Sequence, residues 1–313
     1  MCIRDREVPV GGVAAKLVDR RYFTMSVATL KLIYHTAKVR LGFLITVCAV
    51  TGIVVIPDHE LAPWQVFVLG LATLIASSAA GAFNQLYERD LDIRMQRTRA
   101  RPFATGRFVA DLRWYGGIAL ALLLALAAAA VATNWLAAFF VFLGAFTYGV
   151  VYTVWLKRRS WTNIVIGGLS GSFAVLAGSA AAGATLSPVA LILAAVLFLW
   201  TPPHFWSLAF ACKDDYRAAG VPMLPVVVDD ETSTRTILAH AVALSLLSVL
   251  PLWYGMSWLY GIAAIGGGIF FVHACLRLVR KRDRGSAWRA FAASIAQLGI
   301  LMLGAILDRL FLA

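Results

Sequence analysis

Residues 64–86 read WQVFVLGLATLIASSAAGAFNQL, and the residues that follow, 87–102, read YERDLDIRMQRTRARP. The first segment is apolar over almost its whole length, and a helix of about 20 apolar residues crosses the hydrocarbon core of a membrane. The second segment holds five arginines and three acidic residues. The junction therefore predicts a membrane-spanning helix that ends in a strongly charged loop.

The rest of the chain has the same character. Hydrophobic residues make up 61% of the 313 positions and charged residues only 14%, a composition that ordinary soluble domains do not have. Nine segments are apolar enough for a span, at residues 41–57, 64–86, 114–133, 135–155, 161–183, 187–210, 236–256, 257–279 and 290–312. We therefore predict an all-α, polytopic membrane protein with nine transmembrane helices in one bundle.

Positive charge is distributed very unevenly between the two ends of these spans. Of the 28 lysines and arginines, all but Arg309 fall on one side. Because short cytoplasmic loops retain Lys and Arg, the N-terminus is predicted inside and the C-terminus outside. The same rule accounts for the net charge of +12 without nucleic acid as a partner. We predict a cytosolic arm at 1–37 and an intramembrane domain at 38–313, in a bacterial inner membrane or, as the alternative, a mitochondrial inner membrane.

Two connections on the charged side are long, 87–113 and 213–235, whereas those on the other side are short turns. Both follow a span that ends in acidic residues, and they lie four spans apart. This spacing predicts two similar four-helix halves followed by a ninth helix. Such an internal repeat places the two acidic ends across a shared cavity.

Three oxygen-bearing side chains mark the end of the second span. If its helix continues beyond residue 86, Asn84, Glu88 and Asp92 fall at i, i+4 and i+8 and share one face. We name these three residues the first acidic motif. Magnesium prefers one or two carboxylates together with substrate phosphate oxygens, and nearby arginines, including Arg97 and Arg101, provide planar donors for phosphate. The alternative is a set of ion pairs on a solvated loop.

A second acidic site lies at the end of the sixth span, within ACKDDYRAAGVPMLPVVVDD, residues 211–230. It contains Lys213, Asp214, Asp215 and Arg217, and we name Asp214 and Asp215 the second acidic motif. Two matching acidic sites on one face of the membrane favour binding of a metal and a diphosphate over solvated ion pairs.

These segments resemble the motifs of the UbiA-type intramembrane prenyltransferases, in the branch that acts on haem. The resemblance rests on NQLYERDLDIRMQRTRARP (84–102), YTVWLKRRSWTNIVIGG (152–168) and TPPHFWSLAFACKDDYRAAGVPMLPVV (201–227). It covers about residues 38 to 312. The implied activity is transfer of a farnesyl group from farnesyl diphosphate to a vinyl carbon of haem B, with addition of water, giving haem O and diphosphate.

The resemblance also implies roles for residues. Asn84, Glu88 and Asp92 would hold Mg²⁺, with Asp214 or Asp215 serving the second pole. Adjacent residues on a helix point about 100° apart, so we expect one of the two to approach the metal and favour Asp215. The cations expected to neutralise the diphosphate leaving group are Arg97, Arg101, Lys157, Arg158 and Lys213.

His204 is the candidate contact for haem, because it follows Pro202-Pro203 inside a predicted span and an intramembrane histidine indicates function. The alternative is a hydrogen bond to a backbone carbonyl that the prolines free. The farnesyl tail is expected among apolar side chains or in contact with membrane lipid.

Two other functions stay open at this stage. One is prenyl transfer to a quinone precursor or a chlorin, and the other is secondary transport with the carboxylates coupling ions. The haem hypothesis includes contact with a downstream haem-modifying enzyme or a terminal oxidase assembly.

Overall fold

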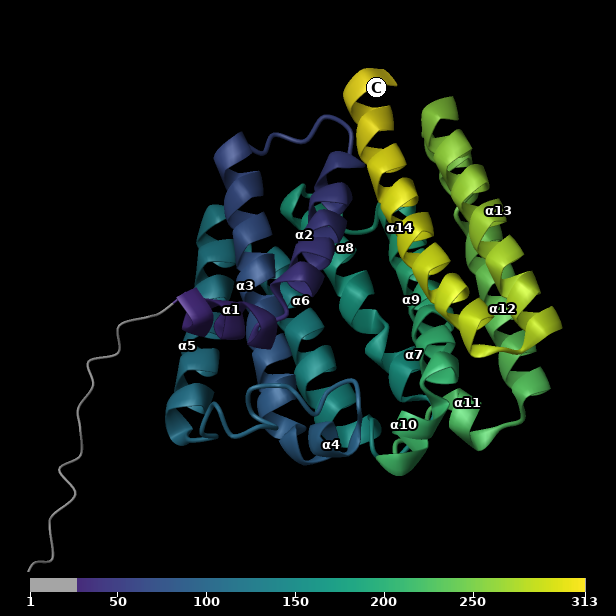
Figure 1. The fold of residues 1–313 in the computed structure, drawn as a ribbon. Helices are drawn as coiled ribbons and strands as arrows, with labels where there is room; N and C mark the ends of the chain where they lie inside the picture. The colour runs from purple at the N-terminus through teal and green to yellow at the C-terminus, as the bar shows by residue number, and fades with distance from the viewer. Residues whose placement is uncertain (1–26, 313) are drawn as a thin grey trace, which may run out of the picture.

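The computed structural model describes residues 27–312, and all the regular structure within that range is helical (Figure 1). The elements are α1 (Val27–Thr36), α2 (Val39–Val54), α3 (Pro63–Tyr87), α4 (Arg89–Arg94), α5 (Leu112–Ala132), α6 (Trp135–Phe146), the π-helix η1 (Thr147–Leu156), α7 (Asn163–Gly167), α8 (Leu169–Ala181), α9 (Pro188–Ala211), α10 (Lys213–Ala218), α11 (Leu224–Val227), α12 (Asp230–Leu247), the 3₁₀ helix η2 (Leu250–Tyr254), α13 (Trp258–Lys281) and α14 (Arg284–Leu312). The all-α prediction is confirmed.

The predicted membrane spans are present as helices. In the described part of the chain, 8 helices are long and apolar enough to cross a membrane, and α1 and α2 together form a ninth that is bent by 48°. The chain is therefore a multi-pass membrane protein. Of the predicted arm, the structure describes only the end, which forms α1; residues 1–26 lie outside the described residues.

Two helices begin about six residues before the predicted spans. The helix α12 begins at Asp230, where the Asp229 side chain caps it by accepting a hydrogen bond from the Thr232 backbone N–H (2.8 Å). The helix α14 begins at Arg284. Hydropathy marks only the apolar part of a helix, so these polar first turns were missed.

The short helices α4, α10 and α11 gather with the charged loops at one edge of the bundle, which we call the polar edge. In Figure 1, α4, α10 and α11 lie at the lower edge, and the C-terminal end of α14 lies at the opposite edge. The two long charged loops thus share one face, as the sequence predicts.

The two acidic motifs are built alike. Each lies where a long span is interrupted at one residue, Glu88 (φ −92°, ψ 12°) after α3 and Cys212 (φ −118°, ψ 33°) after α9. A helix of six residues follows in both cases, α4 and α10. This shared construction agrees with the two related halves predicted from loop spacing.

Glycines allow α2 and α8 to cross at close range. A Cβ atom built on Gly178 of α8 would collide with the backbone carbonyl of Ala49, and one on Gly52 of α2 would collide with that of Val175. The crossing therefore brings the two backbones into direct contact, as small residues do between membrane helices. It fixes the two helices against each other near their C-terminal ends.

We predict that Gly178→Ala destabilises the protein by about 1–3 kcal/mol, because the added methyl group must separate two backbones. The measurement is thermal unfolding of the purified protein in detergent. Gly266→Ala is the matched control, since its Cβ meets nothing within 4 Å, and it should leave the unfolding temperature equal or higher. Equal behaviour of the two variants would show that the α2–α8 crossing tolerates separation.

Candidate active site

A cavity of about 610 Å³ lies at the polar edge of the bundle, a size typical of ligand-binding sites. Its polar end is lined by Asn84, Asp92, Arg97, Arg101 and Lys157, among others. Its apolar end is lined by side chains of α2, α9 and α14, including Leu44, Cys48, Leu197 and Leu298. We call it the main cavity.

The first acidic motif shares one face, as the sequence predicts. The Glu88 backbone N–H donates to the Asn84 carbonyl (3.0 Å), and the Asp92 N–H donates to the Glu88 carbonyl (2.9 Å). The helical register therefore persists across the interruption at Glu88. All three side chains are buried.

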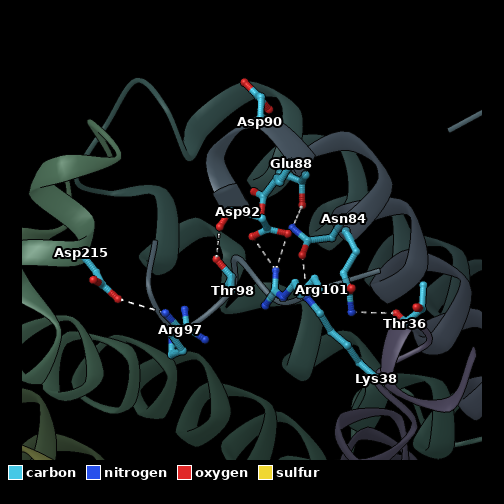
Figure 2. Close-up of polar contacts among 12 residues, drawn as sticks. Thr36, Lys38, Asn84, Glu88, Asp90, Asp92, Arg97, Thr98, Arg101 and Asp215 are labelled. Carbon is cyan, nitrogen blue, oxygen red and sulfur yellow. Dashed lines mark hydrogen bonds and ion pairs between the residues drawn. The ribbon is translucent and has the colours of Figure 1, made fainter. Parts of the chain in front are cut away.

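Each side chain of the first acidic motif is bound by a different cation. Lys38 Nζ donates to Asn84 Oδ1 (2.6 Å), Lys157 Nζ to Glu88 Oε2 (2.5 Å), and Arg101 Nη1 to both carboxylate oxygens of Asp92 (2.8 and 2.9 Å). Figure 2 shows Arg101 and Lys38 converging on the motif from different segments. We name Lys38, Arg101 and Lys157 the motif cations. They come from the α1–α2 turn, the loop after α4 and the loop after η1.

Lys38 is the residue that the sequence analysis missed. It lies at the bend between α1 and α2 in the left-handed region (φ 49°), which few non-glycine residues occupy. Its Nζ also donates to the Tyr148 hydroxyl (2.8 Å). The only signal in the sequence is a single lysine just before the first span, and that position does not reveal a contact with Asn84.

The π-helix η1 contributes Tyr148 and Tyr152 to the wall of the main cavity. Its turn is wider than that of an α-helix, and it aligns Tyr148 and Tyr152 with ring centroids 5.7 Å apart. Thr153 accepts a hydrogen bond from Asn84 Nδ2 (3.0 Å). Hydropathy cannot distinguish a π-helix from an α-helix, so the sequence did not predict it.

The donor set of the first acidic motif suits a hard divalent cation. Across residues 27–312, no three His, Cys, Asp or Glu side chains lie close enough to hold a metal ion by themselves. Two carboxylates and the Asn84 amide oxygen are nevertheless adjacent, and Glu88 Oε1 is buried without a hydrogen-bond partner. Because magnesium takes few carboxylates and completes its shell with phosphate and water oxygens, the residues fit this ion.

The two residues of the second acidic motif face in different directions. Asp215 Oδ2 accepts a hydrogen bond from the Arg97 backbone N–H (3.3 Å), which connects the second motif to the loop that follows the first motif (Figure 2). The Asp214 side chain is 97% exposed and pairs with Arg217 (3.0 Å). Lys213 pairs instead with Asp230 (2.7 Å). Of the adjacent pair, Asp215 is thus the one turned toward the first motif.

Lys157 and Arg158 are adjacent but have different surroundings. Lys157 lines the main cavity, whereas Arg158 forms two hydrogen bonds with Asp90 (2.8 and 2.9 Å), whose side chain is 52% exposed. These bonds hold the pKa of the Asp90 carboxyl below its usual value. The structure therefore does not bring Arg158 to the cavity with the other predicted cations.

His204 lies in the protein interior, and it is not among the residues that line the main cavity. Its ring stacks between Trp200 (centroids 4.3 Å apart) and Phe291 (4.5 Å). Its Nδ1 lies 2.7 Å from Ser294 Oγ, and that hydroxyl donates to the Phe291 carbonyl. The partner is a hydroxyl of α14, so the alternative of a carbonyl freed by the prolines is wrong.

Residues 44–300 match the UbiA prenyltransferase family, and the chain belongs to that family. It is 52% identical over 285 residues to Protoheme IX farnesyltransferase 2 of Paramagnetospirillum magneticum, across 90% of this chain and 98% of the relative. It is 44% identical to Protoheme IX farnesyltransferase 1 of the same organism, across 87% of this chain and 96% of the relative. The resemblance inferred from the motifs is confirmed.

Solved structures show the same fold at low identity. A digeranylgeranylglyceryl phosphate synthase superposes with a TM-score of 0.74 at 17% identity, covering 90% of this chain and 99% of that one. A UbiA homologue from Archaeoglobus fulgidus bound to GPP and Mg²⁺ superposes with a TM-score of 0.65 at 16% identity, covering 88% and 98%.

We predict that Lys157→Met lowers the free energy of unfolding by about 3 kcal/mol, because it leaves the Glu88 carboxylate buried and unpaired. The neighbouring Arg158→Met is the matched control. Its partner Asp90 is half exposed, so the loss should stay below about 1 kcal/mol. Thermal unfolding in detergent measures both, and an equal loss in the two variants would contradict the buried pair.

Proposed function

We propose that the chain transfers a farnesyl group from farnesyl diphosphate to a vinyl group of haem B, with addition of water, giving haem O and diphosphate. Two relatives named protoheme IX farnesyltransferase match almost their whole length to it. The observation that carries the proposal is the pairing of the first acidic motif with three cations at the polar end of an otherwise apolar cavity.

The polar end suits a diphosphate. The motif cations and Arg97 line the cavity wall, where ammonium and guanidinium groups donate to diphosphate oxygens as negative charge develops on the leaving group. Magnesium, held by Asn84, Glu88 and Asp92 with Asp215 serving the second pole, would neutralise part of that charge. Arg158, Lys213 and Asp214 lie in ion pairs outside the cavity, so the proposal gives them no contact with substrate.

The apolar end suits the farnesyl tail. Side chains such as Leu44, Leu197 and Leu298 provide a surface without charge, and a dry surface protects an allylic cation from early capture by water. Haem then occupies the part of the cavity between the tail and the second acidic motif. His204 stays the proposed haem contact, and its two stacked aromatic neighbours would have to move for its ring to bind iron.

The proposed location is the inner membrane of a bacterium, with the polar edge toward the cytoplasm. This orientation rests on the positive residues, nearly all of which fall on the side of the two motifs. Haem B and farnesyl diphosphate are the proposed substrates, and a downstream haem-modifying enzyme or terminal oxidase assembly is the further proposed partner.

The direct test supplies the purified protein in lipid vesicles with haem B, farnesyl diphosphate and Mg²⁺. We expect a more hydrophobic haem whose mass increases by a farnesyl group plus one water, measured by liquid chromatography and mass spectrometry. Chelation of Mg²⁺ should remove the product. Transfer to 4-hydroxybenzoate with none to haem would assign the chain to quinone-type prenyl transfer.

The same assay carries a matched pair of variants. Asp92→Asn should lower turnover by about 100-fold or more, because a charged ligand at the leaving group is lost, while the protein keeps its fold. Asp90→Asn, two residues away, removes only an exposed ion pair and should keep nearly full turnover. Similar activity of both variants would remove Asp92 from the site.

A further inference from the structure

A second, smaller cavity adjoins the main cavity on the side of α3. Its volume is about 60 Å³. Leu41, Ile45, Tyr148 and Ser170 line both cavities, so the two are in contact along this wall. We call it the small cavity.

Hydroxyl groups interrupt the apolar lining of the small cavity. Thr73 and Ser77 lie one turn apart on α3, and Ser170 faces them from α8. The Thr73 side chain is 3% exposed, and its hydroxyl has no hydrogen-bond partner. Thr51 of α2 shows the usual arrangement, since its hydroxyl donates to the Val47 carbonyl (2.8 Å).

An unpartnered buried hydroxyl indicates that something else satisfies it. Leaving a buried donor unsatisfied costs free energy, and polar cavities of this size hold ordered water whereas apolar ones stay dry. A bound water needs two to four polar contacts, and Thr73, Ser77 and Ser170 are hydroxyl-bearing residues in the lining of this cavity. These features suit the small cavity to bind water within the membrane-spanning part of the bundle.

We propose that the small cavity holds the water that is added to the vinyl group of haem. This inference rests on the proposed function, which requires one water in a cavity that otherwise excludes it. The water must also be kept from the farnesyl cation until the carbon–carbon bond has formed. Water that meets the farnesyl cation first gives farnesol, whereas water that arrives after carbon–carbon bond formation gives the hydrated product.

The chemistry balances without a further reactant. The allylic carbon–oxygen bond breaks, and its electron pair leaves with diphosphate. The π electrons of the vinyl group form the new carbon–carbon bond to the farnesyl carbon, which leaves a cation on the vinyl carbon next to the macrocycle. Water adds its oxygen there, and its proton passes to a diphosphate oxygen.

The position of the hydroxyls separates the water from the first step. Thr73 lies 11 residues before Asn84 on the same helix, a distance of about 16 Å along the axis. Ser170 and Tyr148 are the polar side chains at the wall shared with the main cavity. The Tyr148 hydroxyl is bound by Lys38 (2.8 Å), which also binds Asn84 (2.6 Å). The proposed water is therefore bound near Thr73, far from Asn84 along α3. It would enter the main cavity past Tyr148 and Ser170 at the shared wall.

The test measures the ratio of hydrated to unhydrated farnesyl-haem formed by the double variant Thr73→Val/Ser77→Ala. Without held water, the second cation loses a proton instead, and the product is an alkene that is lighter by one water. We expect the ratio to fall about tenfold, since two hydrogen bonds to water are lost. Total farnesylated haem should change much less. Thr51→Val is the matched control, since it makes the same replacement away from both cavities.

An unchanged ratio in the double variant, with the product made at the wild-type level, would overturn the proposal. If the double variant does not fold, the same ratio is measured for Ser170→Ala, which removes a hydroxyl on α8. An unchanged ratio in that variant would also overturn the proposal. A wild-type protein that farnesylates no haem would end the proposed function and this inference with it. If the wild-type protein makes haem O, the proposed function holds, and the ratio of hydrated to unhydrated farnesyl-haem in the variants then tests the water site separately.

Discussion

The site depends on the pairing of buried oxygen atoms with buried cations inside a membrane protein. Two carboxylates and three cations at this depth are costly unless each finds a partner, and the first acidic motif and the motif cations provide those partners for one another. Several unusual elements of the fold serve this pairing. The bend between α1 and α2 directs Lys38 inward, and the wide π-helix η1 ends directly before Lys157 and places Thr153 against Asn84.

The same pairs explain how a binding site for diphosphate is kept charged but stable. In the structure, Arg101 and Lys157 are neutralised by the two carboxylates of the motif, Lys38 is bound by the Asn84 amide, and each motif oxygen is satisfied except Glu88 Oε1. In the proposed reaction, a metal would take the motif oxygens and the cations would take the diphosphate, so each buried charge would exchange one partner for another. The Arg97–Asp215 contact holds the second motif beside this exchange.

Much of this fold could be predicted from the sequence, because hydropathy and the distribution of Lys and Arg are properties of local segments and need no knowledge of tertiary contacts. Helical periodicity was enough to place Asn84, Glu88 and Asp92 on one face and to expect that Asp214 and Asp215 point in different directions. What failed depends on tertiary contacts. Lys38 gives no local signal, because its partner is 46 residues away. Lys157 and Arg158 look equivalent in sequence, and only the turn after η1 separates their directions.

The central claim is that the two acidic motifs bind one diphosphate at the polar end of the main cavity. The most direct measurement is a structure of the protein with Mg²⁺ and an unreactive farnesyl diphosphate that carries sulfur in place of the bridging oxygen. The account predicts the diphosphate between Asp92 and Asp215, with Arg101 and Lys157 bound to its oxygens. A diphosphate bound elsewhere, with the Arg101–Asp92 and Lys157–Glu88 pairs unchanged, would contradict it.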